Sequence, residues 1–319
     1  MSSLVLSPSA KSQGVQKQQK EKINAKGTLL AVGANLAASI LPTPVNSLLA
    51  KGMPAISNTL TKDEIAIVNE GSKKVLNEIT NLGQKGVEIN NFTFAGINLS
   101  NIPDWLMEKI NGVYATARGK NAAYINPEGY IKTKSSFDAL GIKPNSIIVN
   151  QDKLPMAVFH ELGHAFNFNN SSFWKSLQKM RTPAMVIGLI ISLIPAFTKE
   201  TKAKEGEELT KKQKFINGLR KACPALAGLS MTPILLEEGM ATLRGNKWAK
   251  QVLNTDLAKK VAKGNGMAFA TYAIAAVGLA LTAFVTKKVK DKSDEKIAFK
   301  SQVNIENKKE RLQLGHHQG

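Results

Sequence analysis

The segment 158–166, Val-Phe-His-Glu-Leu-Gly-His-Ala-Phe, restricts the fold of this chain more than any other. On a helix, His160 and His164 lie one turn apart on the same face, so two imidazoles can reach one metal ion. Glu161 follows His160 and can reach a water molecule bound to that ion. The flanking residues are uncharged, so the helix can be buried with only its His-Glu-His edge polar. The pattern predicts a Zn²⁺ site with His160 and His164 as ligands and Glu161 as general base.

The alternative interpretation is a chance match on a helix with two hydrogen-bonded core histidines. The chain has four histidines, of which His316 and His317 lie in its tail. Because the other two flank a glutamate at helical spacing, the metal site is the better interpretation.

A catalytic zinc site has three protein ligands and one open position. The segment 235–242, Leu-Leu-Glu-Glu-Gly-Met-Ala-Thr, offers two glutamates between apolar residues compatible with a helix. Adjacent helical residues point about 100° apart, so only one of Glu237 and Glu238 can face the ion. We prefer Glu238 as the third ligand, and the small Ala241 one turn further on lets this helix pack close to the histidine helix. Glu237 as the ligand, and a solvated acidic pair, remain open alternatives.

The chain has four uncharged runs, at residues 27–50, 182–198, 222–236 and 264–286. Basic residues flank them, except that the third run ends at Glu237-Glu238. The last run exceeds the ~18 residues expected of a membrane span, whereas the second and third fall just short. The first run contains Asn35 and two prolines, so a weak span, a membrane-surface or re-entrant segment and an uncleaved signal anchor all stay open. A soluble protein with a buried helical hairpin is the alternative to a multi-pass membrane protein.

The runs suggest a division of the chain. It comprises a disordered basic tail (1–26), a hydrophobic segment (27–50), a domain with the histidine helix (51–181), a transmembrane hairpin (182–236) with a basic loop (199–221), a glutamate helix and linker (237–263), a transmembrane helix (264–286) and a charged tail (287–319). Two crossings in the hairpin return the chain to the same membrane face, so Glu238 can meet the histidine helix.

The net charge of +19 raises nucleic acid as a partner, but the sequence lacks aromatic residues interleaved with the basic ones for base stacking. Basic segments beside apolar runs are instead typical of membrane flanks that face anionic lipid. We therefore expect a lipid bilayer and no nucleic acid as partner. The single cysteine, Cys223, excludes disulfides within the chain and a cysteine zinc site.

Local patterns predict the elements before the histidine helix. Thr61-Lys62-Asp63-Glu64 is a capping box that starts a helix ending near Leu82. A shorter helix is expected at 103–112, and short strands are expected at 113–117, 122–125, 130–134 and 146–149, with a turn at 126–129. A linker follows the histidine helix after Asn170.

With its HExxH segment and Glu238-Gly239-Met240-Ala241, the chain resembles the gluzincin metallopeptidases, above all the membrane-embedded CAAX-prenyl-protease and HtpX-like group. Residues 121–124, Asn-Ala-Ala-Tyr, are loosely similar to the edge strand of that family. The resemblance covers roughly residues 113–245. It implies a mostly helical α+β fold with a zincin-like core and membrane-spanning helices, and a peptidase that acts on an extended protein or peptide segment at a sheet edge.

Two features depart from the family. The family has aspartate four residues after its third ligand, to support a ligand histidine, and here that position is Thr242. A hydroxyl can orient an imidazole but supplies no charge. The family's histidine that stabilises the transition state has no identifiable counterpart, which leaves Arg244, Tyr124 and Tyr130 as candidates for that role.

Two other functions remain open. A site-2-type intramembrane protease also uses HExxH, but its LDG-type third-ligand motif is absent. A non-catalytic membrane protein with a structural zinc would need a fourth ligand, for which the sequence offers only His316 and His317.

Overall fold

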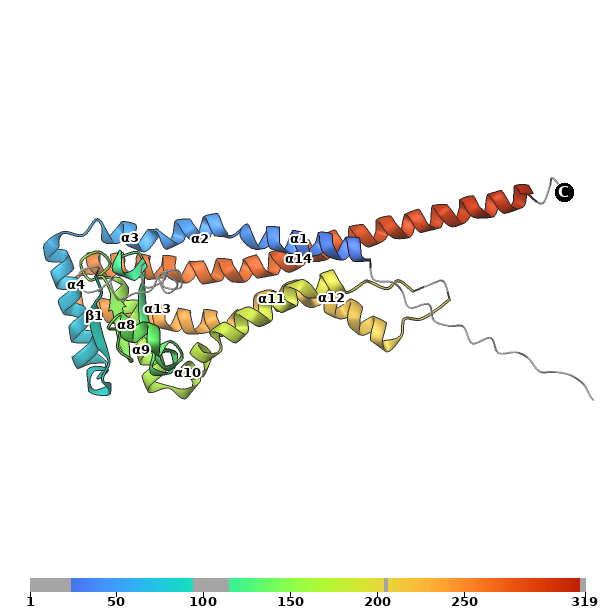
Figure 1. Cartoon of the computed structure of the whole chain (residues 1–319). Helices are drawn as coiled ribbons and strands as arrows, with labels where there is room; N and C mark the ends of the chain where they lie inside the picture. Colours follow the sequence, from blue (N-terminus) through green and yellow to red (C-terminus); the bar gives the residue numbers. More distant parts are fainter. Residues whose placement is uncertain (1–23, 94–114, 204–205, 316–319) are drawn as a thin grey trace, which may run out of the picture.

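The computed structural model describes residues 24–93, 115–203 and 206–315 of an elongated, mostly helical molecule (Figure 1). A small sheet and several short helices form one end, from which a bundle of long helices extends. The helices are α1 (Ala25–Ile40), α2 (Thr43–Ala50), α3 (Gly52–Ser57), α4 (Lys62–Lys74), α7 (Pro127–Lys132), α8 (Lys134–Ala139), α9 (Ala157–Asn170), α10 (Ser172–Lys179), α11 (Arg181–Phe197), α12 (Lys211–Leu229), α13 (Thr232–Val252) and α14 (Thr255–Gly315). A π-helical turn, η1 (Val75–Ile79), and a 3-10 turn, η2 (Gly83–Lys85), follow α4.

The sheet has three strands, β1 (Glu88–Asn91), β2 (Ala122–Ile125) and β3 (Ser146–Val149). The buried β3 lies in the middle, with β1 parallel to it on one side and β2 antiparallel on the other. The strands predicted at 122–125 and 146–149 are thereby confirmed. The edge of β2 that faces away from β3 has no strand partner in the described part of the chain.

Helix α4 begins where the sequence predicts. The Thr61 hydroxyl accepts the Glu64 N–H at 3.2 Å, and the Glu64 carboxylate accepts the Thr61 N–H at 2.8 Å. This reciprocal capping box satisfies two N–H groups that the first turn leaves without helical partners. The helix reaches Lys74 and continues through η1, a little short of the predicted end at Leu82.

The strand predicted at 130–134 is wrong, because those residues lie in α7, at Thr133 and at the start of α8. The Asn126 side chain accepts the Gly129 N–H at 2.7 Å, and Pro127 occupies the first helical turn. Both are helix-start signals, so the segment interpreted as a turn initiates a helix instead.

Three other local predictions also need correction. The linker expected after Asn170 is helix α10, whose first turn is capped by the Ser171 side chain. Strand β1, Glu-Ile-Asn-Asn, was missed because it has a single bulky apolar residue. The strand predicted at 113–117 is helical at 115–117, and its first two residues, like the helix predicted at 103–112, lie outside the described residues.

Helices α9 and α13 pack closely enough to bring both halves of the predicted metal site together. A Cβ atom on Gly163 would lie 2.4 Å from the Ala241 carbonyl oxygen, and one on Gly245 would lie 2.5 Å from the Phe159 carbonyl oxygen. The other face of α9 places fully buried side chains, including Phe159 and Leu162, in the main core. The expectation that Ala241 permits a close approach of the two helices is confirmed.

The bundle holds α1, α11, α12 and α14 side by side, with α11 and α12 forming the predicted hairpin (Figure 1). This hairpin carries the chain away from α9 and returns it to α13. The uncharged run 222–236 is not a single helix, because the chain breaks between α12 and α13 at Ser230 and Met231. Helix α12 also begins eleven residues earlier, in the basic loop.

Two stretches of the described helices, Ala25–Ser57 and Thr255–Asn307, are long and apolar enough to cross a membrane. A third candidate exists if α10 and α11, which meet at a bend of 46°, count as one span. The runs at 27–50 and 264–286 therefore lie in candidate spans. Helix α12 is not among these candidates, so the second crossing of the predicted hairpin stays a prediction.

The polar side chains of the bundle face one another. Asn35, which weakens the first apolar run, donates to the Ser192 hydroxyl at 3.1 Å and to the Thr286 hydroxyl at 2.9 Å. Further from the sheet, the buried Arg220 pairs with Asp291 at 2.6 Å. Large apolar side chains are exposed on the outer surfaces of α1, α11 and α14. The bundle thus buries polar side chains together with small apolar ones and exposes large apolar side chains, the arrangement expected of helices in lipid.

Candidate metal centre

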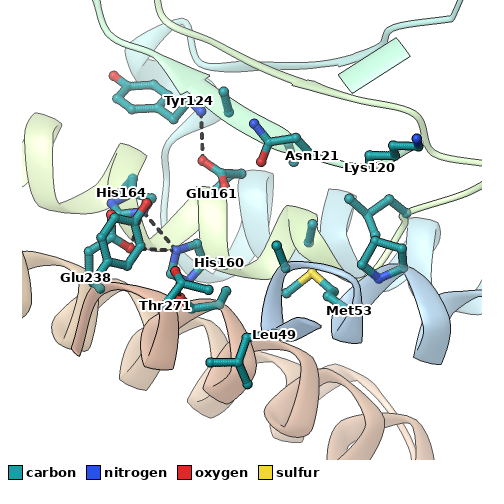
Figure 2. Close-up of a pocket in the computed structure, with 18 of the residues that line it drawn as sticks. Leu49, Met53, Lys120, Asn121, Tyr124, His160, Glu161, His164, Glu238 and Thr271 are labelled. Atoms are coloured by element: carbon teal, nitrogen blue, oxygen red, sulfur yellow. Dashed lines mark hydrogen bonds and ion pairs between the residues drawn. The ribbon is translucent and has the colours of Figure 1, made fainter. Parts of the chain in front are cut away.

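The two histidines of α9 direct their Nε2 atoms at the same point. These atoms lie 3.0 Å apart, and the rings are perpendicular with centroids 4.6 Å apart (Figure 2). Both side chains are buried. Neutral imidazoles in this arrangement can share one proton between the two Nε2 atoms. When neither Nε2 carries a proton, both lone pairs are directed at the point where a metal ion would bind.

Glu238 supplies the third donor. Its Oε2 lies 3.1 Å from His160 Nε2 and 3.5 Å from His164 Nε2. Ligands placed tetrahedrally about 2.0–2.1 Å from Zn²⁺ are separated from one another by roughly 3.3–3.4 Å. The three donor atoms therefore form one face of a coordination tetrahedron of the right size, so these residues fit a zinc ion.

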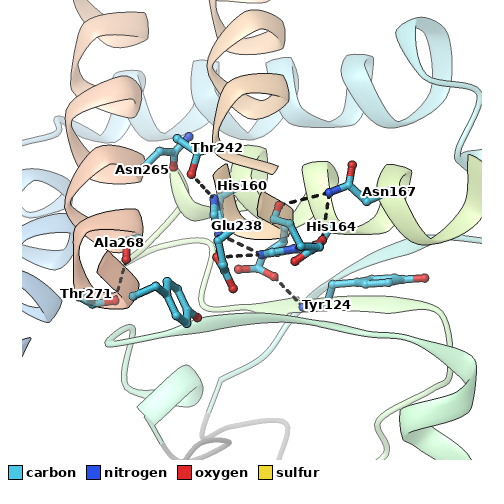
Figure 3. Close-up of polar contacts among 12 residues, drawn as sticks. Tyr124, His160, His164, Asn167, Glu238, Thr242, Asn265, Ala268 and Thr271 are labelled. Atoms are coloured by element: carbon cyan, nitrogen blue, oxygen red, sulfur yellow. Dashed lines mark hydrogen bonds and ion pairs between the residues drawn. The ribbon is translucent and has the colours of Figure 1, made fainter. Parts of the chain in front are cut away.

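Glu237 has a different role, because it binds the other side of His164. Its Oε1 lies 2.9 Å from His164 Nδ1 and accepts a hydrogen bond from Asn167 at 2.9 Å, on the side of His164 where Figure 3 labels Asn167. It also accepts a hydrogen bond from Gln178 at 2.7 Å. A hydrogen bond at Nδ1 fixes the tautomer that leaves Nε2 free for a metal ion. The pair is fully buried, which excludes the alternative of a solvated acidic pair.

Thr242 provides the matching contact for the other histidine. Its hydroxyl lies 3.3 Å from His160 Nδ1, one helical turn beyond Glu238 (Figure 3). The position where the family carries aspartate therefore contacts the ring as the resemblance implies. The contact is longer than that of Glu237 with His164 and carries no charge, so the two histidines are oriented unequally.

The carboxylates of the site outnumber its cationic side chains among the described residues. Arg181 pairs with Glu238 and lies 3.5 Å from Glu237. With both imidazoles neutral, this guanidinium and the carboxylates of Glu161, Glu237 and Glu238 sum to a net charge of minus two. Burial alone would disfavour the imidazolium form, yet Glu237 and Glu238 outweigh it and raise the pKa of His164 well above its ordinary value. A divalent cation bound to neutral imidazoles would neutralise the cluster, because its charge equals that deficit.

Glu161 lies on the open side of the three donors. Its Oε2 accepts the backbone N–H of Tyr124 at 2.8 Å, which ties the carboxylate to the free edge of β2 (Figure 2). A cavity of about 370 Å³ adjoins this point and is lined by His160, His164, Glu161 and Glu238. Its other walls come from α2, α3, β2 and α14.

The three residues predicted to stabilise a transition state point elsewhere. The Tyr124 hydroxyl lies 2.6 Å from the Asn145 side chain and 2.9 Å from that of Asn169. The Tyr130 hydroxyl contacts Asp138, and Arg244 contacts Asn167 and stacks on Phe166. None of the three side chains reaches the metal-facing atoms, although the backbone of Tyr124 does contact Glu161.

Sequence reasoning missed four residues around this centre. They are Arg181 and Gln178, which contact the glutamate pair, Asn167, which supports Glu237, and Tyr272, which lines the cavity. The positions of Gln178, Arg181 and Tyr272 depend on the packing of α10, α11 and α14 against α9 and α13, which no local pattern reveals. Only the helical offset from His164 to Asn167 could have indicated a shared face.

Comparisons with models of protein families, with curated proteins and with solved structures find no match for this chain. The interpretation of the site therefore rests on its own geometry and on the sequence motifs.

Proposed function

We propose that this protein is a membrane-associated, zinc-dependent metalloendopeptidase. The observation that carries the proposal is the set of three donor atoms, one each from His160, His164 and Glu238, separated by 3.0 to 3.5 Å at the wall of a cavity. A carboxylate, Glu161, adjoins the same cavity on its free-strand side. Two imidazoles, one ligand carboxylate and a separate basic carboxylate are the parts that zinc-assisted hydrolysis needs.

The free edge of β2 is suited to an extended peptide. Because the Tyr124 N–H points away from β3 toward Glu161, the backbone of Ala122, two residues earlier, faces the same edge. A peptide added antiparallel or parallel to this edge would pass directly by the three donors, with main-chain hydrogen bonds giving affinity.

Apolar side chains from the first candidate span suggest where the substrate comes from. Leu49 and Met53 line the cavity opposite β2, and both belong to the stretch Ala25–Ser57 (Figure 2). The cavity therefore adjoins a helix that is a candidate for membrane insertion. The substrate class that fits is an extended protein segment with bulky apolar side chains, at the membrane surface.

The chain's own residues divide the chemistry. Zinc, when bound, would activate a water molecule and polarise the substrate carbonyl. Glu161 accepts the proton of the water as its oxygen bonds to the carbonyl carbon, and returns that proton to the amine when the C–N bond breaks. Glu237 and Thr242 hold the imidazoles of His164 and His160 in orientation. Water is consumed, and the products are one carboxylic acid and one amine.

The two other functions are less well supported. A site-2-type protease would carry its histidines within a span, whereas α9 is not among the candidate spans of the described chain and follows directly from the sheet. A closed structural zinc would need a fourth ligand. Within the described residues, the remaining acids near the histidines are Glu161, held by β2, and Glu237, held at Nδ1 of His164. One coordination position is thus left open to the cavity.

The test is to measure metal content by mass spectrometry on detergent-purified wild type and His160→Ala, together with cleavage of a casein-type substrate. One equivalent of zinc in wild type, its loss in the variant and zinc-dependent cleavage are expected. Absence of stoichiometric zinc, or a zinc-loaded protein that cleaves neither casein nor apolar peptides, would contradict the proposal.

A further inference from the structure

We propose that the phenol of Tyr272, held in place by Arg181, donates a hydrogen bond to the carbonyl oxygen of the scissile peptide as that oxygen becomes negatively charged. This inference rests on the proposed peptidase function. It assigns the transition-state role that none of the sequence candidates fills.

Tyr272 enters the site from α14, a helix that sequence reasoning did not connect with the metal centre. Its side chain lines the cavity together with His160, Glu161 and Glu238. The cavity lies between β2 on one side and α14 on the other, and Thr271, the neighbour of Tyr272, marks the α14 side in Figure 3, opposite Tyr124. A peptide paired with β2 therefore lies between that strand and the phenol.

The contacts of the phenol place its proton beside the proposed metal ligand Glu238. Arg181 Nη2 donates to the Tyr272 oxygen at 3.1 Å, and the guanidinium lies 5.4 Å from the ring centroid. In that contact the phenol is the acceptor, and its own O–H lies within hydrogen-bonding reach of the Glu238 carboxylate, the group that a bound metal ion would engage instead. The guanidinium also pairs with Glu238, which fixes the phenol beside a proposed metal ligand.

Two polar neighbours of Tyr272 in the cavity lining, Thr271 and Gln178, already donate elsewhere. The Thr271 hydroxyl donates to the Ala268 carbonyl oxygen at 2.7 Å. Gln178 donates to the Glu237 carboxylate at 2.7 Å and to the His164 carbonyl oxygen at 2.8 Å. Tyr272 thus supplies a donor at the cavity wall where neither neighbour can.

The arrangement suits charge that develops during the reaction. A donor fixed before the reaction stabilises a developing oxyanion without reorganisation, and loss of one such donor typically slows the chemical step by about 10²–10³-fold. The adjacent guanidinium strengthens the phenol as a donor, because its positive charge polarises the O–H bond. Arg181 is therefore a positioning residue and Tyr272 the group that contacts the reacting oxygen.

The experiment compares Tyr272→Phe with wild type, with Tyr130→Phe as the matched control. Both variants remove one phenolic oxygen, but Tyr130 lies outside the cavity and contacts Asp138. Three quantities are measured, namely zinc content, kcat and KM on an apolar peptide, and the calorimetric affinity for a phosphinic peptide analogue that mimics the tetrahedral transition state.

For Tyr272→Phe we expect unchanged zinc content, a KM within about threefold of wild type and a kcat lower by about 10²–10³-fold. The affinity of Tyr272→Phe for the phosphinic analogue should fall by a similar factor. In the inactive Glu161→Gln background, adding Tyr272→Phe should change the affinity for a substrate peptide only slightly. Tyr130→Phe should match wild type in all three quantities. Arg181→Met should lower kcat with zinc retained, and Arg181→Lys should restore part of the loss.

The outcomes separate the two proposals. A zinc-loaded wild type that cleaves no peptide overturns the peptidase function, and the role of Tyr272 with it. A wild type that cleaves, together with a Tyr272→Phe variant whose kcat and phosphinate affinity lie within threefold of wild type, overturns the role of Tyr272 alone. Equal losses in Tyr272→Phe and Tyr130→Phe would also overturn it, because the effect would then not come from the cavity.

Discussion

Glu237 binds Nδ1 of His164 at 2.9 Å, on the side of the imidazole opposite to the donors of the proposed metal site. The two adjacent acids of α13 therefore act on one histidine from two directions, with Glu238 on the Nε2 side and Glu237 on the Nδ1 side. An angle of about 100° between neighbouring helical residues makes this possible, since the first glutamate passes behind the ring while the second faces the cavity.

This relationship predicts graded effects on zinc affinity. Glu238→Ala removes a ligand and should abolish stoichiometric zinc, whereas Glu237→Ala removes only an orienting contact and should weaken binding by about 10–100-fold. Glu237 is fully buried against His164, so its loss affects a proposed ligand even though Glu237 does not face the ion. Competition with a fluorescent zinc chelator measures both affinities.

Glu237→Gln is the control, because its amide oxygen can still accept from Nδ1 while the charge is gone. Any long-range effect of lost charge is shared by all three variants, so the differences among them isolate coordination and orientation. Equal zinc loss in Glu237→Ala and Glu238→Ala would show that the pair acts by its field alone. A larger loss in Glu237→Ala would make Glu237 the ligand.

Glu161→Gln separates metal binding from catalysis. The amide keeps the shape of the side chain and can keep the contact with the Tyr124 N–H through its oxygen, but it cannot accept a proton. Zinc content should equal that of wild type, while hydrolysis should fall by at least ~10²-fold. Cleavage of casein at the wild-type rate by this variant would remove Glu161 from the mechanism.

The sequence predicted those parts of the site that lie within single helices. His160, Glu161 and His164 share one face of α9, and Glu238 and Thr242 lie one turn apart on α13, so helical spacing alone relates the members of each set. The close approach of the two helices was also foreseeable, because Ala241 lies at their contact.

The remaining residues of the site could not be predicted, because their positions depend on packing between distant segments of the chain. Arg181 and Tyr272 come from α11 and α14 and are ninety-one positions apart, yet their side chains meet beside Glu238. The prediction of a turn and a strand at 126–134 was wrong for another reason. A side-chain cap at Asn126 and a proline at the first turn suit a turn and a helix equally well, and the decision depends on the residues that follow.

Gly163 is predicted to be essential for the approach of α9 to α13. An alanine Cβ there would lie 2.4 Å from the Ala241 carbonyl oxygen, a backbone atom that cannot move without shifting the helix. Gly163→Ala should therefore destabilise the protein by about 1–3 kcal/mol and separate His164 from Glu238. Thermal unfolding in detergent and zinc affinity should both decrease.

Gly266→Ala is the matched control for this change. Gly266 lies within α14, where an alanine Cβ would have no neighbouring atom within 4 Å, and alanine is the better helix former. Its midpoint of unfolding should be equal to or higher than that of wild type. A Gly163→Ala variant with the same stability and zinc affinity as Gly266→Ala would show that α9 and α13 can accommodate an extra methyl group at their contact.

Membrane insertion can be tested on the surface of α14 with single cysteines. Cys223 is buried and is the only cysteine, so Cys223→Ser provides a background without thiols. Val277 is 67% exposed in the middle of the apolar run, and Ile131 is 71% exposed on the short helix α7 near the sheet.

In permeabilised membranes, Val277→Cys should resist a water-soluble maleimide because lipid covers it, while Ile131→Cys should react. Both should react after unfolding in dodecyl sulfate, and the protein should remain in the membrane during carbonate extraction. Recovery as a monodisperse species without detergent, with both cysteines equally reactive, would mean that the apolar helices form a water-soluble bundle instead.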